Sequence, residues 1–133
     1  MENAKTTRRL VYVVEDEEEQ LALLRFILAE AQYDVVTESN ADRVLKGVRD
    51  LQPDVVLLDV MLPSETGTDG FQLCQEIKRM KDIKPPIVIL VSAIAQGVGT
   101  LRDKVRTEVG ADDYFVKPYD PSALIARMKQ FLG

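Results

Sequence analysis

Residues 55–63 read Val-Val-Leu-Leu-Asp-Val-Met-Leu-Pro, an apolar run interrupted by a single carboxylate. A short run of this kind, rich in β-branched residues, is typical of a strand buried on both faces of a parallel sheet. In open α/β sheets, ligands bind at the carboxyl ends of the strands. The run therefore predicts a buried strand that presents Asp59 at the edge of the sheet where ligands bind.

Similar runs recur along the chain and alternate with segments of helical periodicity. The expected strands span residues 10–14, 33–37, 55–58, 87–91 and 113–116. The expected helices begin near Glu17, Ser39, Asp69, Thr100 and Asp120. Five strands that alternate with five helices predict an α/β fold, in which helices cover both faces of one parallel, doubly wound sheet.

Two of the helix starts carry the spacing of a capping box, in which side chains at the first turn satisfy free backbone N–H groups. Ser39 precedes Asp42 by three residues, and Thr100 precedes Asp103 by the same spacing. Gly110 stands where a helix commonly ends in a left-handed residue. We therefore expect helices to open at both boxes and the fourth helix to end at Gly110.

Composition limits the classes of protein that this chain can represent. Its 133 residues suit one domain, and we expect a flexible leader at 1–8 and a domain at 9–133. The net charge of -5 argues against direct binding to nucleic acid, and the absence of histidine excludes a Ser-His-Asp triad or histidine-ligated zinc. The lone Cys74 is expected in the core. With no apolar run of ~20 residues and no signal peptide, a cytoplasmic protein without membrane contact is expected.

Chemically active side chains follow four of the expected strands: Glu15 and Asp16 the first, Asp59 the third, Ser92 the fourth and Lys117 the fifth. Clustered carboxylates need a cation to neutralise them, and ligands that are all oxygen favour Mg²⁺, with Mn²⁺ as a substitute. A carboxylate beside such an ion can accept a phosphoryl group as an acyl phosphate. The lysine and the hydroxyl could then stabilise the phosphoryl oxygens.

Each of these residues alone has a plainer interpretation. Asp59 could be a turn residue, Lys117 a surface lysine, and Ser92 a local side-chain to backbone turn. Their shared position at strand ends favours a functional role. For residues 17–19, three further glutamates, we prefer a helix N-terminus that acids stabilise. The glycines at 97–99 lack the rest of a phosphate-binding loop and predict flexible backbone only.

Four motifs in one order extend the argument to a family: VEDE at 14–17, DVMLP at 59–63, SA at 92–93 and VKPY at 116–119. Together they resemble the response regulator receiver domain of two-component signalling, over about residues 9–132. The resemblance implies the flavodoxin-like strand order 2-1-3-4-5, which is known for this fold family. It also implies a protein that catalyses its own aspartyl phosphorylation and dephosphorylation and is not a conventional turnover enzyme.

The resemblance also implies a role for each matching residue. Asp59 would accept a phosphoryl group from a partner histidine kinase or histidine phosphotransfer protein. Glu15, Asp16 and Asp59 would hold Mg²⁺, with the backbone carbonyl of Met61 as a further ligand. Lys117 would pair with Asp59 at rest and with the phosphoryl oxygen afterwards.

In the family, a hydroxyl and an aromatic side chain carry the signal away from the acceptor. Here Ser92 would bind the phosphoryl oxygen, and Tyr114 would turn from exposed to buried, although a plain half-buried aromatic fits Tyr114 equally well. The bond Lys117-Pro118 matches one that is usually cis. The output would be a downstream protein bound through the fourth helix, fifth strand and fifth helix, or a dimer that forms on phosphorylation.

The chain departs from the family pattern at several positions. Glu15 stands where aspartate is commoner, so that its longer arm predicts a water-mediated contact with the metal, and Ser92 replaces the commoner threonine. The segments 63–70 and 92–117 are longer than usual. The first predicts a further partner contact, and the second predicts a mobile loop before a late-starting fourth helix.

Two other functions remain open from the sequence: a scaffold that binds proteins without phosphorylation, and a small phosphohydrolase with Asp59 as nucleophile. The acidic pair, Asp59 and Lys117 disfavour the scaffold. Met61 offers no general acid two residues after the aspartate, which disfavours the hydrolase. Because Met61 and Ile94 are both apolar and cannot position an attacking water, we expect the acyl phosphate to hydrolyse slowly.

Overall fold

The computed structural model describes residues 8–93 and 109–133. Several sequence predictions fall outside these ranges. They concern all but the last residue of the leader at 1–8, the capping box of Thr100 and Asp103, the mobile loop with its late-starting helix, and Ile94. Within the described ranges, no helix is both long and apolar enough to cross a membrane.

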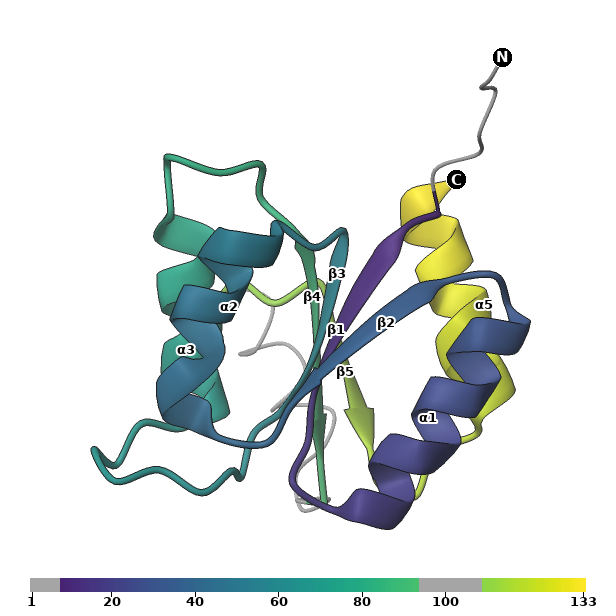
Figure 1. Ribbon diagram of the computed structural model, residues 1–133, viewed down its shortest axis with the longest axis horizontal. Helices are drawn as coiled ribbons and strands as arrows, with labels where there is room; N and C mark the ends of the chain where they lie inside the picture. The colour runs from purple at the N-terminus through teal and green to yellow at the C-terminus, as the bar shows by residue number, and fades with distance from the viewer. Residues whose placement is uncertain (1–7, 94–108) are drawn as a thin grey trace.

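Five parallel strands form one sheet in the order β2-β1-β3-β4-β5, which confirms the predicted order. The strands are β1 (Leu10–Val14), β2 (Asp34–Glu38), β3 (Val55–Asp59), β4 (Ile87–Ser92) and β5 (Asp113–Val116). The helical segments are α1 (Glu18–Glu30), the short 3-10 turn η1 (Ala41–Arg43), α2 (Val44–Leu51), α3 (Gly70–Arg79) and α5 (Pro121–Leu132). Helices α2 and α3 cover one face of the sheet, and α1 and α5 cover the other (Figure 1).

Two apolar layers hold the helices against the sheet, because successive side chains of a strand point to opposite faces. On β1, Tyr12 and Val14 pack toward α2 and α3, whereas Val11 and Val13 pack toward α1 and α5. Every residue of β3 is buried, as the sequence predicted for this strand. The central strands are thus enclosed on both faces, and their polar carboxyl ends meet at one border of the molecule.

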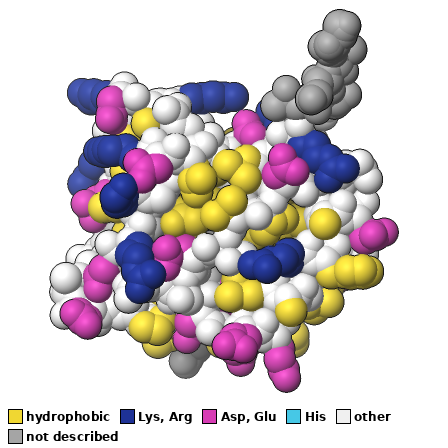
Figure 2. Space-filling model, viewed as in Figure 1, with side chains coloured by type: hydrophobic (Ala, Val, Ile, Leu, Met, Phe, Trp, Pro, Cys, Tyr) yellow, Lys and Arg dark blue, Asp and Glu magenta, His cyan; other side chains and the backbone are white. Residues whose placement is uncertain are grey.

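Strand β2 forms an open edge of the sheet. Its side chains Val35 and Val36 are partly buried, and apolar side chains gather in the middle of this face between α2 and α1 (Figure 2). Charged residues at both ends, Asp34 and Glu38, discourage pairing with another strand. We had expected the strand to begin at Tyr33, but the N–H of Tyr33 still donates to the carbonyl of Leu28 (3.0 Å) at the end of α1.

The predicted capping box at Ser39 is wrong. The cap is Asn40, whose side chain accepts a hydrogen bond from the N–H of Asp42 at 2.7 Å. Two residues explain the difference. The Glu38 carboxylate binds the N–H groups of Ser39 (3.0 Å) and Asn40 (3.1 Å), and the Asp42 carboxylate faces the segment 64–66 instead of Ser39.

The predicted helix starts at Asp69 and Asp120 agree with the structure. Asp69 and Gln72 form a capping box at the start of α3, and Asp120 caps α5. Gly110 has the left-handed conformation that was expected (φ 87°). The Lys117-Pro118 bond is cis, as the family resemblance implied.

Cys74 supplies a test of the packing of α3. Its side chain is fully buried, and burial raises the pKa of the thiol to about 12. Because the thiolate is the reactive form, the folded chain should not react with Ellman's reagent near pH 8. The same sample should release one thiol once it is denatured, which absorbance measures. Rapid labelling of the native chain would show that α3 is not packed as described.

Candidate functional site

The strand ends bring the predicted site residues to one border of the sheet, the lower border in Figure 1. Asp59 and Ser92 are the last residues of β3 and β4. Each strand is therefore one residue longer than predicted, because the sequence pattern placed Asp59 and Ser92 directly after the strands. Ligand oxygens of Glu15, Asp16 and Asp59 lie within 4.8 Å of one another. The acidic cluster formed by these three residues therefore has the geometry of a metal site.

Lys117 lies between two of the three carboxylates. Its Nζ donates to Asp59 Oδ2 and to Glu15 Oε1, each at 2.8 Å. The second oxygen of each carboxylate is also satisfied, because Asp59 Oδ1 accepts the N–H of Met61 (2.9 Å) and Glu15 Oε2 accepts the N–H of Glu17 (3.2 Å). Buried carboxylates need such partners.

The protonation of the site follows from burial and charge. Burial raises the pKa of Glu15, and the charge of Asp59 adds to this rise, while Lys117 and the N–H of Glu17 oppose it. For Lys117, burial alone would lower the pKa, but the hydrogen bonds to Asp59 and Glu15 outweigh burial and raise it. Lys117 therefore remains a cation at neutral pH.

The charges of the acidic cluster suit a divalent cation. Three carboxylates and one ammonium leave two negative charges when all four groups are ionised. Glu15 and Asp59 are buried, whereas Asp16 is exposed and opens the cluster to solvent. A hard divalent ion prefers oxygen ligands and would neutralise this excess. The residues present thus fit a metal ion.

Tyr114 lies on β5, the strand that leads directly to Lys117, and Ser92 ends the neighbouring strand β4. Ser92 is fully buried, and its carbonyl accepts the N–H of Lys117 at 2.8 Å, which fixes the two residues relative to each other. Tyr114 is fully buried in the apolar layer toward α2 and α3. Tyr114 is thus more deeply buried than the half-buried aromatic that the sequence also allowed, and its role as a switch stays a prediction.

Gly70, which sequence reasoning missed, allows α3 to start close to the acceptor strand. A methyl group there would come within 2.6 Å of the Val60 Cα and 2.9 Å of the Asp59 carbonyl oxygen. The N–H of Gly70 also donates to the carbonyl of Val60 (2.9 Å). A glycine directly after the capping Asp69 is visible in the sequence. Only the fold shows that Gly70 lies against the backbone of Asp59 and Val60.

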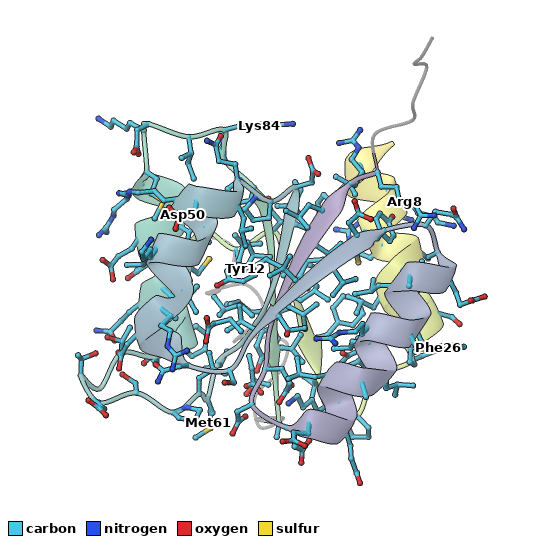
Figure 3. All side chains as sticks on the ribbon, in the orientation of Figure 1. Arg8, Tyr12, Phe26, Asp50, Met61 and Lys84 are labelled. Atoms are coloured by element: carbon cyan, nitrogen blue, oxygen red, sulfur yellow. The ribbon has the colours of Figure 1, made fainter. Side chains whose placement is uncertain are left out.

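Two hollows flank the acidic cluster. One has a volume of about 560 Å³ and lies between Asp16 and the segments 60–64 and 67–69. The other, about 520 Å³, lies between α1 and Lys117 with the residues that follow it. Met61, which lies at this end of the molecule in Figure 3, is 64% exposed. Partners thus have access to the cluster from two sides.

A family profile described as "Response regulator receiver domain" matches residues 11–129. This chain belongs to the response regulator receiver domain family. Transcriptional regulatory protein BaeR of Escherichia coli is 43% identical to this receiver domain over 122 residues, which is 92% of this chain and 47% of BaeR. Alkaline phosphatase synthesis transcriptional regulatory protein PhoP of Bacillus subtilis is 37% identical and covers 92% of this chain and 48% of PhoP. The receiver domain thus spans about half the length of these relatives.

Solved receiver domains share the fold. The BeF3-activated N-terminal receiver domain of Klebsiella pneumoniae RstA has a TM-score of 0.76 and 30% identity, and the match covers 91% of this chain and 96% of that one. The BeF3-activated receiver domain of DrrB, from Thermotoga maritima, has a TM-score of 0.77 and 31% identity, with 95% and 98% covered. The receiver fold of this chain is therefore shown by sequence and by structure.

Replacing Lys117 by methionine tests the electrostatics of the acidic cluster. The change leaves two buried carboxylates without their cationic partner and should lower the free energy of unfolding by about 3 kcal/mol near neutral pH. It also removes a group that holds down the pKa of Glu15. A carboxyl whose pKa is higher in the folded than in the unfolded chain stabilises the fold below its unfolded pKa, and this contribution disappears as the pH rises through the folded pKa.

The deficit of Lys117→Met relative to the wild type should therefore shrink as the pH falls toward Glu15's ordinary pKa. Urea unfolding followed by circular dichroism at several pH values measures this trend. As a control, Lys46→Met removes a lysine that is 82% exposed and should change stability by less than about 0.5 kcal/mol. A deficit for Lys117→Met that grows on acidification would contradict the electrostatic account.

Proposed function

We propose that this receiver domain is a phosphoacceptor of two-component signal transduction, in which Asp59 takes a phosphoryl group in a reaction that depends on Mg²⁺. One observation carries the proposal. The buried Asp59 carboxylate is held at one oxygen by Lys117 and at the other by the N–H of Met61, with two further carboxylates beside it. Such an arrangement suits a carboxylate nucleophile, because the lysine and a bound cation would offset the negative charge of the incoming phosphoryl group.

Phosphoryl transfer needs mainly that the groups are positioned and that the negative charge on the phosphoryl oxygens is stabilised. An oxygen of Asp59 forms a bond to phosphorus as the bond from phosphorus to the donor nitrogen breaks, and the donor imidazole leaves. Lys117 is already within 2.8 Å of Asp59 and can pass to a phosphoryl oxygen without a large movement. The hydroxyl of Ser92, at the end of the neighbouring strand, would bind another phosphoryl oxygen.

Glu15, Asp16 and Asp59, with the backbone carbonyl of Met61, would hold Mg²⁺, and Mn²⁺ could replace it. The bound ion would neutralise charge on the carboxylates and on the phosphoryl group. Support comes from the convergence of the three carboxylates and from their oxygen-only chemistry. The exposed position of Asp16 leaves a side from which an ion can enter.

The phosphodonor would be a histidine kinase or a histidine phosphotransfer protein. Helix α1 offers it an apolar surface beside the acceptor, since Leu23 is 47% exposed and Phe26 is 66% exposed. Leu23 also lines the hollow that includes Lys117, and Phe26 points away from the sheet on the outer side of α1 (Figure 3). A helix of the donor packed there would lie within reach of Asp59.

The output would be a downstream protein, or a second copy of the chain, bound after phosphorylation. The proposed face joins the fourth helix predicted from the sequence, whose residues are mostly outside the described ranges, to β5 and α5. Tyr114 belongs to β5 but is fully buried in the apolar layer, so its side chain is not itself part of the exposed face. The names of BaeR and PhoP describe transcriptional regulators, so control of transcription by a longer protein is one outcome that this receiver domain could serve.

Intact mass spectrometry tests the phosphoacceptor role. Incubation with acetyl phosphate and Mg²⁺ should add one phosphoryl group to the wild type, and Asp59→Asn should abolish the gain because the amide is not a nucleophile. Asp34→Asn, at the opposite end of the sheet, is the matched control and should leave the gain intact. No gain in the folded wild type would favour the scaffold alternative, and a gain that persists in Asp59→Asn would place the acceptor elsewhere.

A further inference from the structure

Residues 61–69 make up most of the loop between β3 and α3, which begins beside the acceptor and is longer than is usual in the family. Both of its ends are fixed at the site. The N–H of Met61 donates to Asp59 Oδ1 (2.9 Å), and the N–H of Gly70 donates to the carbonyl of Val60 (2.9 Å). The middle of the loop has no strand or helix of its own. Other contacts must therefore hold it.

A single carboxylate on the neighbouring turn η1 makes these contacts. Asp42 Oδ1 accepts the hydroxyls of Ser64 and Thr66, each at 2.8 Å, and Oδ2 accepts the N–H of Glu65 at 2.9 Å. These hydrogen bonds lower the pKa of Asp42, so that it is ionised at neutral pH. Beside it, the N–H of Ala41 donates to the carbonyl of Pro63 (3.1 Å).

Hydrogen bonds within the loop extend the effect of Asp42. The hydroxyl oxygen of Ser64 accepts the N–H groups of Thr66 (3.2 Å) and Thr68 (3.1 Å), and the hydroxyls of Thr66 and Thr68 lie 2.7 Å apart. Both Ser64 and Thr66 are oriented by Asp42. One charged side chain thus orders the segment 64–68, most of the middle of the loop.

The ordered loop forms a wall beside the acidic cluster. Its residues line the hollow of about 560 Å³ that Asp16 also lines. The segment 61–63 lies between two anchors, Asp59 at one end and the contacts of Ala41 and Asp42 at the other. The position of this segment also fixes the N–H of Met61, which holds one oxygen of the acceptor Asp59.

We propose that Asp42 is a positioning residue for phosphoryl transfer to Asp59. It acts through the loop at 61–69, since it holds the middle of the loop and thereby limits the conformations of the segment 61–63. The inference rests on the proposed function, because it assigns a role in that reaction. Asp42 lies in η1, directly before α2, and belongs to none of the four sequence motifs of the site.

The physical reason is the cost of ordering a long loop. Each residue that becomes fixed loses conformational entropy, and a longer loop has more conformations to lose. Hydrogen bonds to an ionised carboxylate are stronger than those between neutral groups and can offset this cost. Small misplacements near reacting atoms reduce rates by large factors. Asp42 therefore belongs to the reaction although it does not touch the reacting atoms.

The test compares variants that remove a carboxylate from the same side of the sheet. Asp42→Ala should lower the maximal rate of phosphorylation by phosphoramidate, at saturating Mg²⁺, by about fivefold. The phosphoramidate concentration that gives half of this rate should not change. Asp50→Ala is the matched control, because Asp50 is exposed and pairs only with Lys46 among the described residues. It lies toward the other end of α2, away from the loop (Figure 3).

Two further variants separate positioning from a general loss of stability. Asp42→Asn keeps one oxygen acceptor and should give an intermediate rate. Ser64→Ala combined with Thr66→Val removes the two hydroxyl contacts but leaves the N–H of Glu65 on Asp42. It should lower the rate, but less than Asp42→Ala does, and adding it to Asp42→Ala should cause little further loss. Hydrogen exchange should show faster exchange of the Met61 amide in Asp42→Ala, but not in Asp50→Ala.

All rates are expressed per folded molecule, with the folded fraction from circular dichroism. If the wild type accepts a phosphoryl group and Asp42→Ala does so equally fast, or if Asp50→Ala is slowed to the same extent, this inference is overturned and the proposed function stands. If the folded wild type accepts no phosphoryl group, both are overturned.

Discussion

The contact between Lys117 and two buried carboxylates is the interaction on which the site depends. Asp59 and Glu15 are buried beside Asp16, and Lys117 supplies the positive charge that such a cluster needs, because burial makes unpaired charge costly. The lysine arrives on β5 from a distant part of the sequence, and it can do so only because the five strands are parallel and in this order. The strand order therefore decides whether Lys117 can reach Asp59 and Glu15.

The sequence predicted the parts of this structure that arise from strong local signals. The apolar run before Asp59 admits few structures other than a buried strand, and the residues at strand ends must meet at one border of a parallel sheet. The switch from Ser39 to Asn40 as the cap could not be predicted, because it depends on Glu38 binding both N–H groups. The contact of Glu15 with Lys117 was missed for a similar reason, since it joins two residues that are far apart in the sequence.

Residues outside the motifs also shape the site. Gly70 lets α3 start against the backbone of Asp59 and Val60, and Asp42 orders a loop that begins two residues after the acceptor. Neither residue carries chemistry that a motif search would notice. Both act on the backbone around the acceptor, which suggests that family members with the same four motifs can differ in reactivity through the loop that follows the third strand.

The central claim is that carboxylates from two neighbouring strands share one divalent cation, and diffraction from a crystal soaked in Mn²⁺ tests it most directly. The account predicts an anomalous peak between Asp16 and Asp59, with an oxygen of each about 2.1–2.3 Å from the ion, close to the distances that Mg²⁺ adopts. Lys117 should remain within hydrogen-bond reach of Asp59. A cleft without a peak at saturating Mn²⁺, or an ion bound by Asp16 without Asp59, would contradict the account.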